Sequence, residues 1–447
     1  MKKVKKIMAL LIVLFMVTSC LVAGTAASCK KNEDNVPVEE LSDMEIFIHS
    51  EKKEQKGHVG DESLGIAGVG IEQIEPIEGV FEGLAIRRLT FNDSDDFHPS
   101  WSPDGRSIVF MSDRTGSNDI YKINVDGTGL KRLTTYDNCD SHPVYSPDGR
   151  KIMFVRYDDD GWHATIWMMN PDGSGEVEIS PTGDSICRGK HIDCSPGYEV
   201  AYFHQDDEVY ILDADNPGVE TYLWTSDDDV EGNNYFRFSP DGTKLLVGDG
   251  SNGEQFCVMN TGGTGYLRLT DDVLGEVAKW FNWAPDGRQV VYVSNCIDID
   301  GEGYRGHLRT VNVDGTNRQY IVTAEPEYCI KDPDWGTSGW ITYEYGIDYY
   351  DNQSIWITRP DGSIQHQLTS EFSRGGGGSY MSQPTFSPDG SKILFVAVVD
   401  GNQDIFLIDG IPVPSKVPTL MPVGLIALAA LLSVIATISI TRRREGK

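Results

Sequence analysis

The chain of 447 residues contains 68 acidic and 38 basic side chains, which gives a formal net charge of −30 at neutral pH. A field of this sign repels nucleic acids and anionic membrane surfaces, so the composition excludes both as ligands and favours cations or basic partners. The same charge also suits a protein that has to stay soluble outside the cell.

The first 27 residues predict a secretory signal peptide. Four lysines between residues 2 and 6 precede an apolar stretch from residue 7 to 22, and small residues follow up to Ala27. We therefore expect export of the chain, with cleavage near Ala27. Residues 28–84 are rich in Glu, Lys and Gly and contain no repeat, which predicts a largely disordered spacer.

Seven copies of one pattern follow, in residues 85–410. The clearest copy begins with His98-Pro99-Ser100-Trp101 and continues with the turn Ser102-Pro103-Asp104-Gly105 and an apolar run over residues 107–112. The turn recurs, intact or altered, with its first residue at Ser102, Ser146, Ser195, Ser239, Ala284, Gly336 and Ser387. A repeat of 44 to 52 residues with four strand-length segments predicts an all-β propeller of seven blades, and the degenerate third and sixth copies leave six blades as the alternative.

The two ends of the array predict how the ring closes. The last copy stops after its third strand, residues 404–409, whereas the orphan segment 85–90 ends in the Leu-Thr pair that closes a normal fourth strand. We expect the orphan segment to complete the last blade, because an open sheet edge would otherwise be exposed.

The motif over residues 99–121 resembles the TolB-type propeller repeat: Pro-x-Trp-Ser-Pro-Asp-Gly, then Ile-Val-Phe-x-Ser-Asp-Arg-x-Gly, then Asp-Ile-Tyr. The resemblance extends over about three quarters of the chain and implies the fold. It implies little about function, since propellers of this type serve as periplasmic scaffold proteins, as domains of oligopeptidases and as polysaccharide lyases. The chain has no Gly-x-Ser-x-Gly motif and no α/β stretch for a hydrolase domain, which excludes a complete propeller-gated peptidase.

One position in each copy, four residues before the turn, is expected to face the central channel. Around the ring it is occupied by His98, His142, His191, Tyr235, Trp280, Asp332 and Gln383. Three imidazoles and an amide oxygen from consecutive blades suit a divalent transition metal. The set of His98, His142, His191 and Gln383 is similar in residue type to the three His and one Gln that hold manganese in TolB-like oligogalacturonate lyases. Histidines that only bond neighbouring loops are the alternative.

The other members of this ring, Tyr235, Trp280 and Asp332, are expected to line the channel as binding residues. Acidic loops are expected on the same face. Among them, Asp298, Asp300 and Glu302 resemble part of a calcium loop, although the twelve-residue frame and terminal Glu of a full loop are missing. Calcium is therefore a second candidate ligand, with solvated acidic loops as the alternative.

Six cysteines lie inside the repeats, and an even number in an exported chain favours disulfides. Cys296 follows the second strand of the fifth blade and Cys329 lies where the chain leaves that blade, so propeller topology makes them plausible partners. Cys187 and Cys194 flank the entry to the third blade and are the other candidate pair. Cys257 is predicted as a buried thiol in a third strand.

The C-terminal segment, residues 411–447, predicts a linker and a membrane anchor. Residues 422–440 are uncharged and mostly apolar, enough to cross a bilayer, and Arg442-Arg443-Arg444 follow directly, which places the propeller outside the cell. The tail from Val417-Pro418-Thr419-Leu420 onward resembles the sorting tails of archaeal and some bacterial surface proteins, which a membrane protease removes. A permanent single span is the alternative.

These features predict an exported, surface-anchored propeller that binds a protein, a carbohydrate or a cation at the acidic mouth of its channel without catalysis. An extracellular metal-dependent lyase or hydrolase that acts on carbohydrates is the alternative, and a self-associating surface-coat component is another. The sequence alone leaves open whether the protein is an enzyme.

Overall fold

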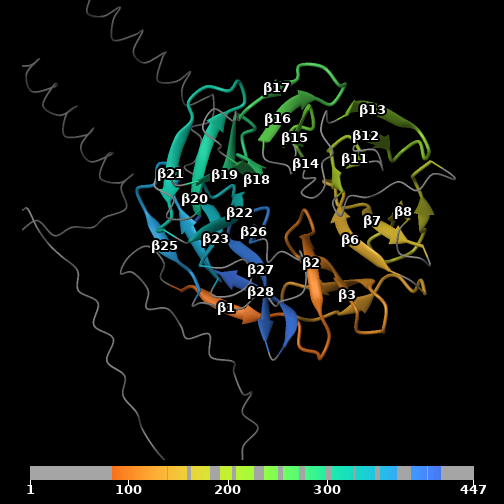
Figure 1. Cartoon of the computed structure of the whole chain (residues 1–447). Coiled ribbons are helices and arrows are strands. Elements are labelled where there is room, and N and C mark those ends of the chain that lie inside the picture. Colours follow the sequence, from red (N-terminus) through yellow and green to blue (C-terminus); the bar gives the residue numbers. More distant parts are fainter. Residues whose placement is uncertain are drawn as a thin grey trace, which may run out of the picture. The chain divides into compact units, whose positions relative to one another are not determined.

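The computed structural model describes residues 83–137, 139–158, 163–181, 192–203, 208–225, 236–249, 255–270, 277–297, 304–326, 328–347, 353–369, 384–399 and 401–413. Within these ranges the strands form seven four-stranded antiparallel sheets, arranged as blades around a common axis (Figure 1). The prediction of an all-β, seven-bladed propeller is confirmed, and the six-bladed alternative is wrong.

The predicted signal peptide, the spacer up to residue 82 and the predicted C-terminal span all lie outside the described ranges. In the part of the chain that the structure describes, no helix has the length and hydropathy needed to cross a membrane.

The blades are numbered in chain order. The four strands of each blade are given in their order from the axis of the ring to its rim. Blades one to three are β2 (Asp96–Trp101), β3 (Ser107–Ser112), β4 (Asp119–Asn124), β5 (Lys131–Arg132); β6 (Asp140–Tyr145), β7 (Ile152–Tyr157), β8 (Ala164–Met169), β9 (Val177–Glu178); β10 (Asp193–Cys194), β11 (Glu199–Phe203), β12 (Glu208–Asp213) and β13 (Glu220–Thr225). Blades four and five are β14 (Phe236–Phe238), β15 (Lys244–Asp249), β16 (Gln255–Asn260), β17 (Leu267–Arg268); β18 (Val277–Trp283), β19 (Gln289–Ile297), β20 (Tyr304–Asn312) and β21 (Gln319–Thr323). Blades six and seven are β22 (Cys329–Trp335), β23 (Ile341–Gly346), β24 (Gln353–Thr358), β25 (Gln365–Gln367); β26 (Thr385–Phe386), β27 (Lys392–Val399), β28 (Asn402–Asp409) and β1 (Ala85–Arg88).

The Ser-Pro-Asp-Gly turn between the first two strands of a blade is held by its own side chains. Ser102 Oγ donates to Asp104 Oδ1 at 2.6 Å and accepts the backbone N–H of Ser107 at 2.9 Å. Gly105 takes a φ of 66°, which an L side chain disfavours. The same Ser–Asp bond recurs in three other blades, at Ser146–Asp148, Ser239–Asp241 and Ser387–Asp389.

The N-terminal strand closes the ring. β1 pairs antiparallel with β28, with Ala85 opposite Asp409, and an ion pair of 2.7 Å joins Arg88 Nη2 to Asp404 Oδ2. The predicted closure by the orphan segment is therefore confirmed. The chain also enters and leaves the propeller at one place, since a Cβ on Gly410 would lie 2.7 Å from the carbonyl oxygen of Gly83.

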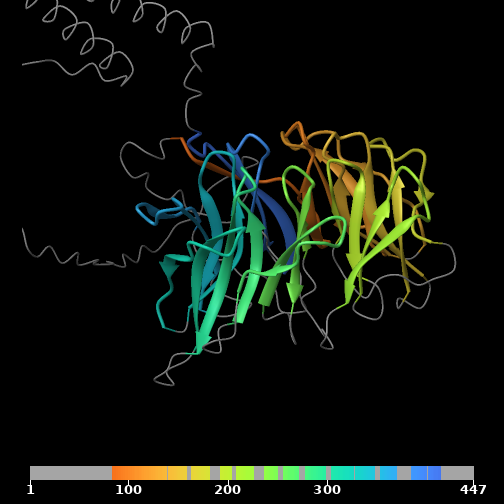
Figure 2. The same cartoon turned by 90° about the horizontal axis from the view of Figure 1, so that it is seen from above.

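The core consists of apolar clusters between neighbouring blades. One cluster joins Val109 and Ile120 of blade one to Ile152 and Phe154 of blade two. Another joins blade one to blade seven across the closure. Seen at a right angle to the first view, the strands run between the two faces of the ring (Figure 2). Because each blade packs on both neighbours, the inner strands are held in a fixed ring around the axis.

Candidate binding site at the mouth of the channel

The position four residues before each turn has an unusual backbone. His98, His142, Trp280 and Asp332 have φ values of 51°, 50°, 46° and 46°. Each lies at a β-bulge, where the pairing of the first and second strands shifts register. Such a left-handed conformation costs a residue with a side chain about 1–3 kcal/mol, and a bulge redirects the side chain. Its recurrence in four blades makes it a property of the repeat.

In blades one and two this position brings two histidines together. The ring centroids of His98 and His142 are 4.1 Å apart and their planes are tilted by 40°. His142 is buried, and its Nδ1 lies 3.0 Å from Ser141 Oγ. The other two predicted metal ligands, His191 and Gln383, lie outside the described residues. Two of the four predicted donors are therefore adjacent.

Metal sites find no further support within the described ranges, which hold no group of three or more His, Cys, Asp or Glu side chains placed to bind a metal ion. The predicted calcium ligands Asp298, Asp300 and Glu302 lie outside those ranges. Both metal sites remain predictions.

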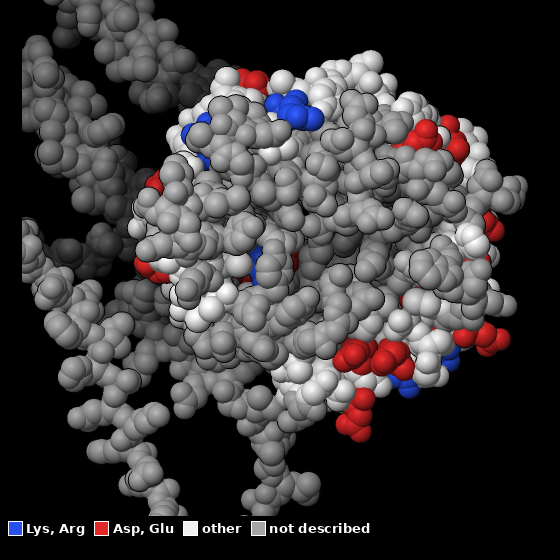
Figure 3. Space-filling model, viewed as in Figure 1, with Lys and Arg blue, Asp and Glu red and all other residues white. Residues whose placement is uncertain are grey.

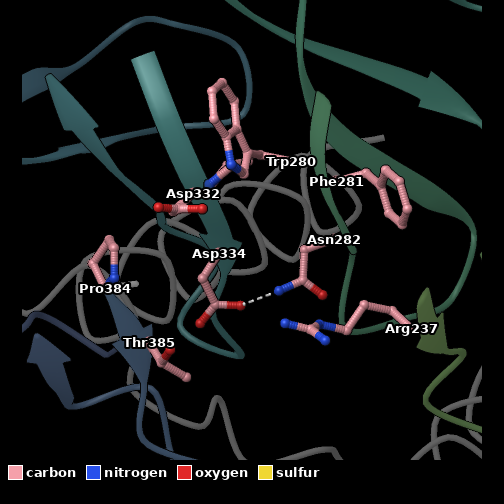
Figure 4. Close-up of a pocket in the computed structure, with 9 residues that line it drawn as sticks. Arg237, Trp280, Phe281, Asn282, Asp332, Asp334, Pro384 and Thr385 are labelled. Atoms are coloured by element: carbon pink, nitrogen blue, oxygen red, sulfur yellow. Dashed lines mark hydrogen bonds between the residues drawn. The ribbon is translucent and has the colours of Figure 1, made fainter. Parts of the chain in front are cut away.

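In blades five and six the same position contributes to a pocket (Figure 4). Trp280 and Asp332 line it together with Arg237, Phe281, Asn282, Pro333, Asp334, Pro384 and Thr385. The structure therefore places two of the predicted channel residues in one pocket, while the third, Tyr235, lies outside the described residues. Because an indole, a guanidinium, an amide and two carboxyl groups surround it, this pocket can both contact and orient a ligand.

A second ring of residues was missed in the sequence. It lies two residues before each turn and contains Ser100, Val144, Asp193, Arg237, Asn282, Asp334 and Thr385. Its members in blades four to seven line the pocket. The signal that could have found them is the recurrence of polar residues two residues before the turn, which Val144 alone interrupts.

The carboxyl groups of this second ring bond to neighbouring blades. Asp334 Oδ2 accepts the backbone N–H of Phe386 at 2.7 Å, and Asp334 Oδ1 accepts Asn282 Nδ2 at 2.8 Å. Asp193 Oδ2 accepts the backbone N–H of Phe238 at 2.8 Å in the same manner. The second ring therefore links the innermost strands of adjacent blades.

Indole groups provide equivalent links at two other blade junctions. Trp101 Nε1 donates to the carbonyl of Thr385 at 3.2 Å, and Trp283 Nε1 donates to the carbonyl of Arg237 at 2.9 Å. These inner-strand hydrogen bonds thus join consecutive blades beside the pocket. A site supported in this way is rigid enough to hold its side chains in place.

Burial shifts the acidity of the two linking carboxyl groups. Burial raises the pKa of Asp334 to about 6, although the backbone N–H of Phe386 and the charge of Arg237 act in the opposite direction. Burial also raises the pKa of Asp193, and here the charge of Arg237 is the largest opposing effect. Arg237 is thus the cation that stabilises both carboxylates.

The cysteine predictions have mixed outcomes. Cys257 lies in β16 and is buried, as predicted. Cys194 is a free, buried thiol whose Sγ donates to the carbonyl of Ser195 at 3.5 Å, so the predicted Cys187–Cys194 disulfide finds no support. Cys187 and the side chain of Cys296 lie outside the described residues, and among those described the structure contains no disulfide.

The charge of the surface agrees with the composition. On the face shown in Figure 3, acidic side chains form several groups along the rim and basic side chains are fewer. The described residues of the channel follow the same trend. Asp193, Asp332 and Asp334 stand against Arg237 alone, a formal charge of −2 when all three carboxyl groups are ionised.

The sequence matches a known family over part of the propeller. Residues 80–189 match a family model described as the TolB beta propeller domain. A Protein TolB homolog from Chlorobium luteolum is 34% identical over 126 residues, which make up 28% of this chain and 25% of that protein. The Tol-Pal system protein TolB of Bordetella pertussis is 47% identical over 45 residues, 10% of each chain. The chain therefore spans a quarter or less of the length of these curated relatives.

Solved structures resemble a larger part of the chain. An oligogalacturonate lyase in complex with manganese superposes with a TM-score of 0.59 at 14% identity, covering 74% of this chain and 93% of that one. The oligogalacturonate lyase of Vibrio parahaemolyticus gives a TM-score of 0.58 at 14% identity, covering 72% and 93%. At such low identity this similarity shows the fold alone.

Proposed function

We propose that this TolB-like β-propeller is a non-catalytic binding module, exported and displayed at the cell surface, whose channel mouth recognises a protein partner. One observation carries the proposal. At the mouth the repeat keeps one strained backbone conformation in four blades and places three kinds of side chain on it, an imidazole at His98 and His142, an indole at Trp280 and a carboxyl group at Asp332. A constant frame with varied side chains is what recognition of a specific partner requires.

Two further features support recognition of a protein. The pocket contains aromatic residues and an arginine, which are enriched where proteins bind one another. The matched relatives carry the name TolB, and one is described as part of a Tol-Pal system, which is a system of proteins. Export and anchoring rest on the predicted signal peptide, residues 1–27, and on the apolar segment 422–440.

The test is site-specific photo-crosslinking in the native host. A benzoylphenylalanine replaces Trp280 at the mouth in one strain and Tyr222, an exposed residue of the outer strand β13, in the other. We expect one defined protein to be captured from the mouth position only, and excess purified chain to compete with the capture. Equal capture from both positions, or none from the mouth, would remove the proposed function.

The adjacency of His98 and His142 favours a second candidate, a metal-dependent enzyme that acts on carbohydrates. The oligogalacturonate lyase with a similar fold contains manganese. In this chain the two imidazoles would supply nitrogen ligands, which suit manganese, iron or zinc, and a bound ion would act as a Lewis acid.

Elemental mass spectrometry of the purified full chain decides between the two candidates, with a His98→Ala/His142→Ala double variant beside it. A stoichiometric transition metal that the variant lacks, together with cleavage of acidic polysaccharides, would replace the binding function by an enzymatic one. A chain without such a metal retains the binding function.

A further inference from the structure

We infer that the propeller is held with its turn face toward the membrane, so that the channel mouth points away from it and the partner arrives from the external medium. The turn face is the end of the ring that carries the turns between the first and second strands, such as Ser102–Gly105. The inference rests on the proposed function, because it takes residues 422–440 as the anchor. It names the side from which the mouth receives its partner.

The propeller begins and ends on the turn face. β28 ends at Asp409 and β1 begins at Ala85, and these two residues are paired in the last blade. Beyond β28, the backbone N–H of Ile411 donates to the carbonyl of Ser391 at 3.0 Å. Ser391 directly follows the turn of blade seven, so the chain leaves the propeller beside that turn.

The departing chain is fixed between two blades. The carbonyl of Pro412 accepts the indole N–H of Trp340 at 3.0 Å, and Trp340 directly follows the turn of blade six. Ile411 is buried and packs in the apolar cluster that joins blades six and seven. Val413, the last residue described, is exposed. The folded propeller itself therefore sets the face from which the chain continues toward the predicted anchor.

Only a short linker separates this exit from the predicted anchor. Residues 414–421 are eight residues long, and a fully extended chain of that length spans at most about 30 Å. β27 and β28, with eight residues each, cross a blade over about 25 Å. With the mouth toward the membrane, the linker would be used almost entirely to pass the height of the blade. No room for a protein would then remain between the mouth and the bilayer, whereas the opposite orientation leaves the mouth accessible.

The mouth residues lie farther from the turn face than the second ring does. Trp280 and Asp332 are four residues before their turns, about 13 Å along an extended strand, whereas Asn282 and Asp334 are two residues before them. Asp334 bonds to Asn282 and to the backbone N–H of Phe386, so the second ring ties the blades together between the mouth residues and the turns. The mouth is therefore directed toward the face that points to the medium.

Energy transfer to the bilayer measures the orientation. The full chain is reconstituted in phosphatidylcholine vesicles that contain a rhodamine-labelled lipid as acceptor, and dansylalanine replaces Leu130 in one protein and Phe91 in the other. Leu130 precedes β5 on the turn face, Phe91 follows β1 on the opposite face, and both side chains are exposed. We expect at least about twofold stronger loss of dansyl fluorescence at Leu130, because the two positions differ in height by roughly 20 Å.

A second pair on other blades controls for a tilt of the ring. Tyr266 precedes β17 on the turn face and is 45% exposed, and Ile347 follows β23 on the opposite face and is 44% exposed. We expect the stronger loss at Tyr266. Equal loss at both ends of either pair, absent loss included, or stronger loss at Phe91 or Ile347, would overturn the inference.

The source of the partner gives an independent test. Cells that carry benzoylphenylalanine in place of Trp280 are grown without isotope label and mixed with 15N-labelled cells that lack the chain. We expect the protein crosslinked at the mouth to carry 15N, because a partner that arrives from the medium exchanges between cells. A captured protein without 15N would indicate a partner held in the same membrane; the inference would then be wrong, and the proposed function would stand.

Discussion

Replacing Asp334 by Asn tests the buried carboxyl group that links blades six and seven. Asp334 accepts the backbone N–H of Phe386 at 2.7 Å and Asn282 Nδ2 at 2.8 Å, and burial raises its pKa to about 6. Its ordinary value is 3.8. Each pKa unit corresponds to 1.36 kcal/mol, so ionisation of this group in the folded protein is about 3 kcal/mol less favourable than in the unfolded chain.

The sign of the effect on stability follows from proton linkage. Because the folded protein binds the proton of Asp334 more tightly than the unfolded chain does, the contribution to stability is complete below the ordinary pKa of 3.8 and is lost as the pH rises through about 6. The amide that replaces the carboxyl group in the variant does not titrate. The free energy of unfolding of the wild type, relative to that of Asp334→Asn, should therefore fall by about 2–3 kcal/mol between pH 4 and pH 7.

Urea denaturation of both proteins at pH 4, 5, 6 and 7, followed by tryptophan fluorescence, measures this difference directly. Titrating groups that share no partner with Asp334, such as Asp404, contribute equally to both proteins and cancel. Asp361→Asn is the control, since hydrogen bonds from Ser363 lower the pKa of Asp361, so that this group titrates below the measured range and its difference from the wild type should change little between pH 4 and pH 7. A pH-independent difference for Asp334→Asn would refute the reasoning.

Two further predictions concern a packing contact between blades and an ion pair within one blade. Gly390→Ala would place a Cβ 2.5 Å from the backbone nitrogen of Ser338 in the preceding blade, whereas Gly127→Ala meets nothing within 4 Å at a similarly positive φ. We therefore expect Gly390→Ala to lower the free energy of unfolding by about 1–3 kcal/mol more than Gly127→Ala, as measured by thermal denaturation. Equal losses for the two variants would contradict the close contact between Gly390 and Ser338. Arg156→Ala leaves buried Asp140 without its ion pair and should lower the free energy of unfolding by about 3–5 kcal/mol. Arg150, whose side chain is 82% exposed, is the matched control, and Arg150→Ala should lower this free energy by less than about 1 kcal/mol. Similar losses for both variants would count against a stabilising role of the buried pair.

The repeat made the fold predictable from the sequence. Seven turn motifs at regular spacing define seven blades, and the surplus strand at residues 85–90 has a place only where the last blade lacks one. Such patterns are local, because each turn is built from bonds between residues at most five apart, as with Ser102 and Ser107. A local pattern can be recognised without knowing what lies beside it.

The site was predictable only in part, because its decisive contacts are not local. The position of His98 and Asp332 at the channel followed from the repeat. The second ring did not, since Asp193 bonds to a backbone group 45 residues away and Asp334 to one 52 residues away, each in the next blade. In the sequence these side chains resemble ordinary polar residues ahead of a turn. Their role depends on burial and on a neighbour that the chain reaches only after a full repeat.

The two rings of inner-strand residues, four and two residues before each turn, make different contacts. Residues of the second ring, Asp193, Arg237 and Asp334, form hydrogen bonds between neighbouring blades. Changes at these residues therefore affect the stability of the whole propeller. The position four residues before each turn, occupied by Trp280 and Asp332 in blades five and six, lies at a bulge. The backbone conformation of this bulge does not depend on the side chain, since a histidine, a tryptophan and an aspartate all adopt it. Under the proposed function, a propeller built in this way would alter what its mouth binds without altering how its blades are joined. Such a separation is what the proposed recognition of a partner requires of the repeat.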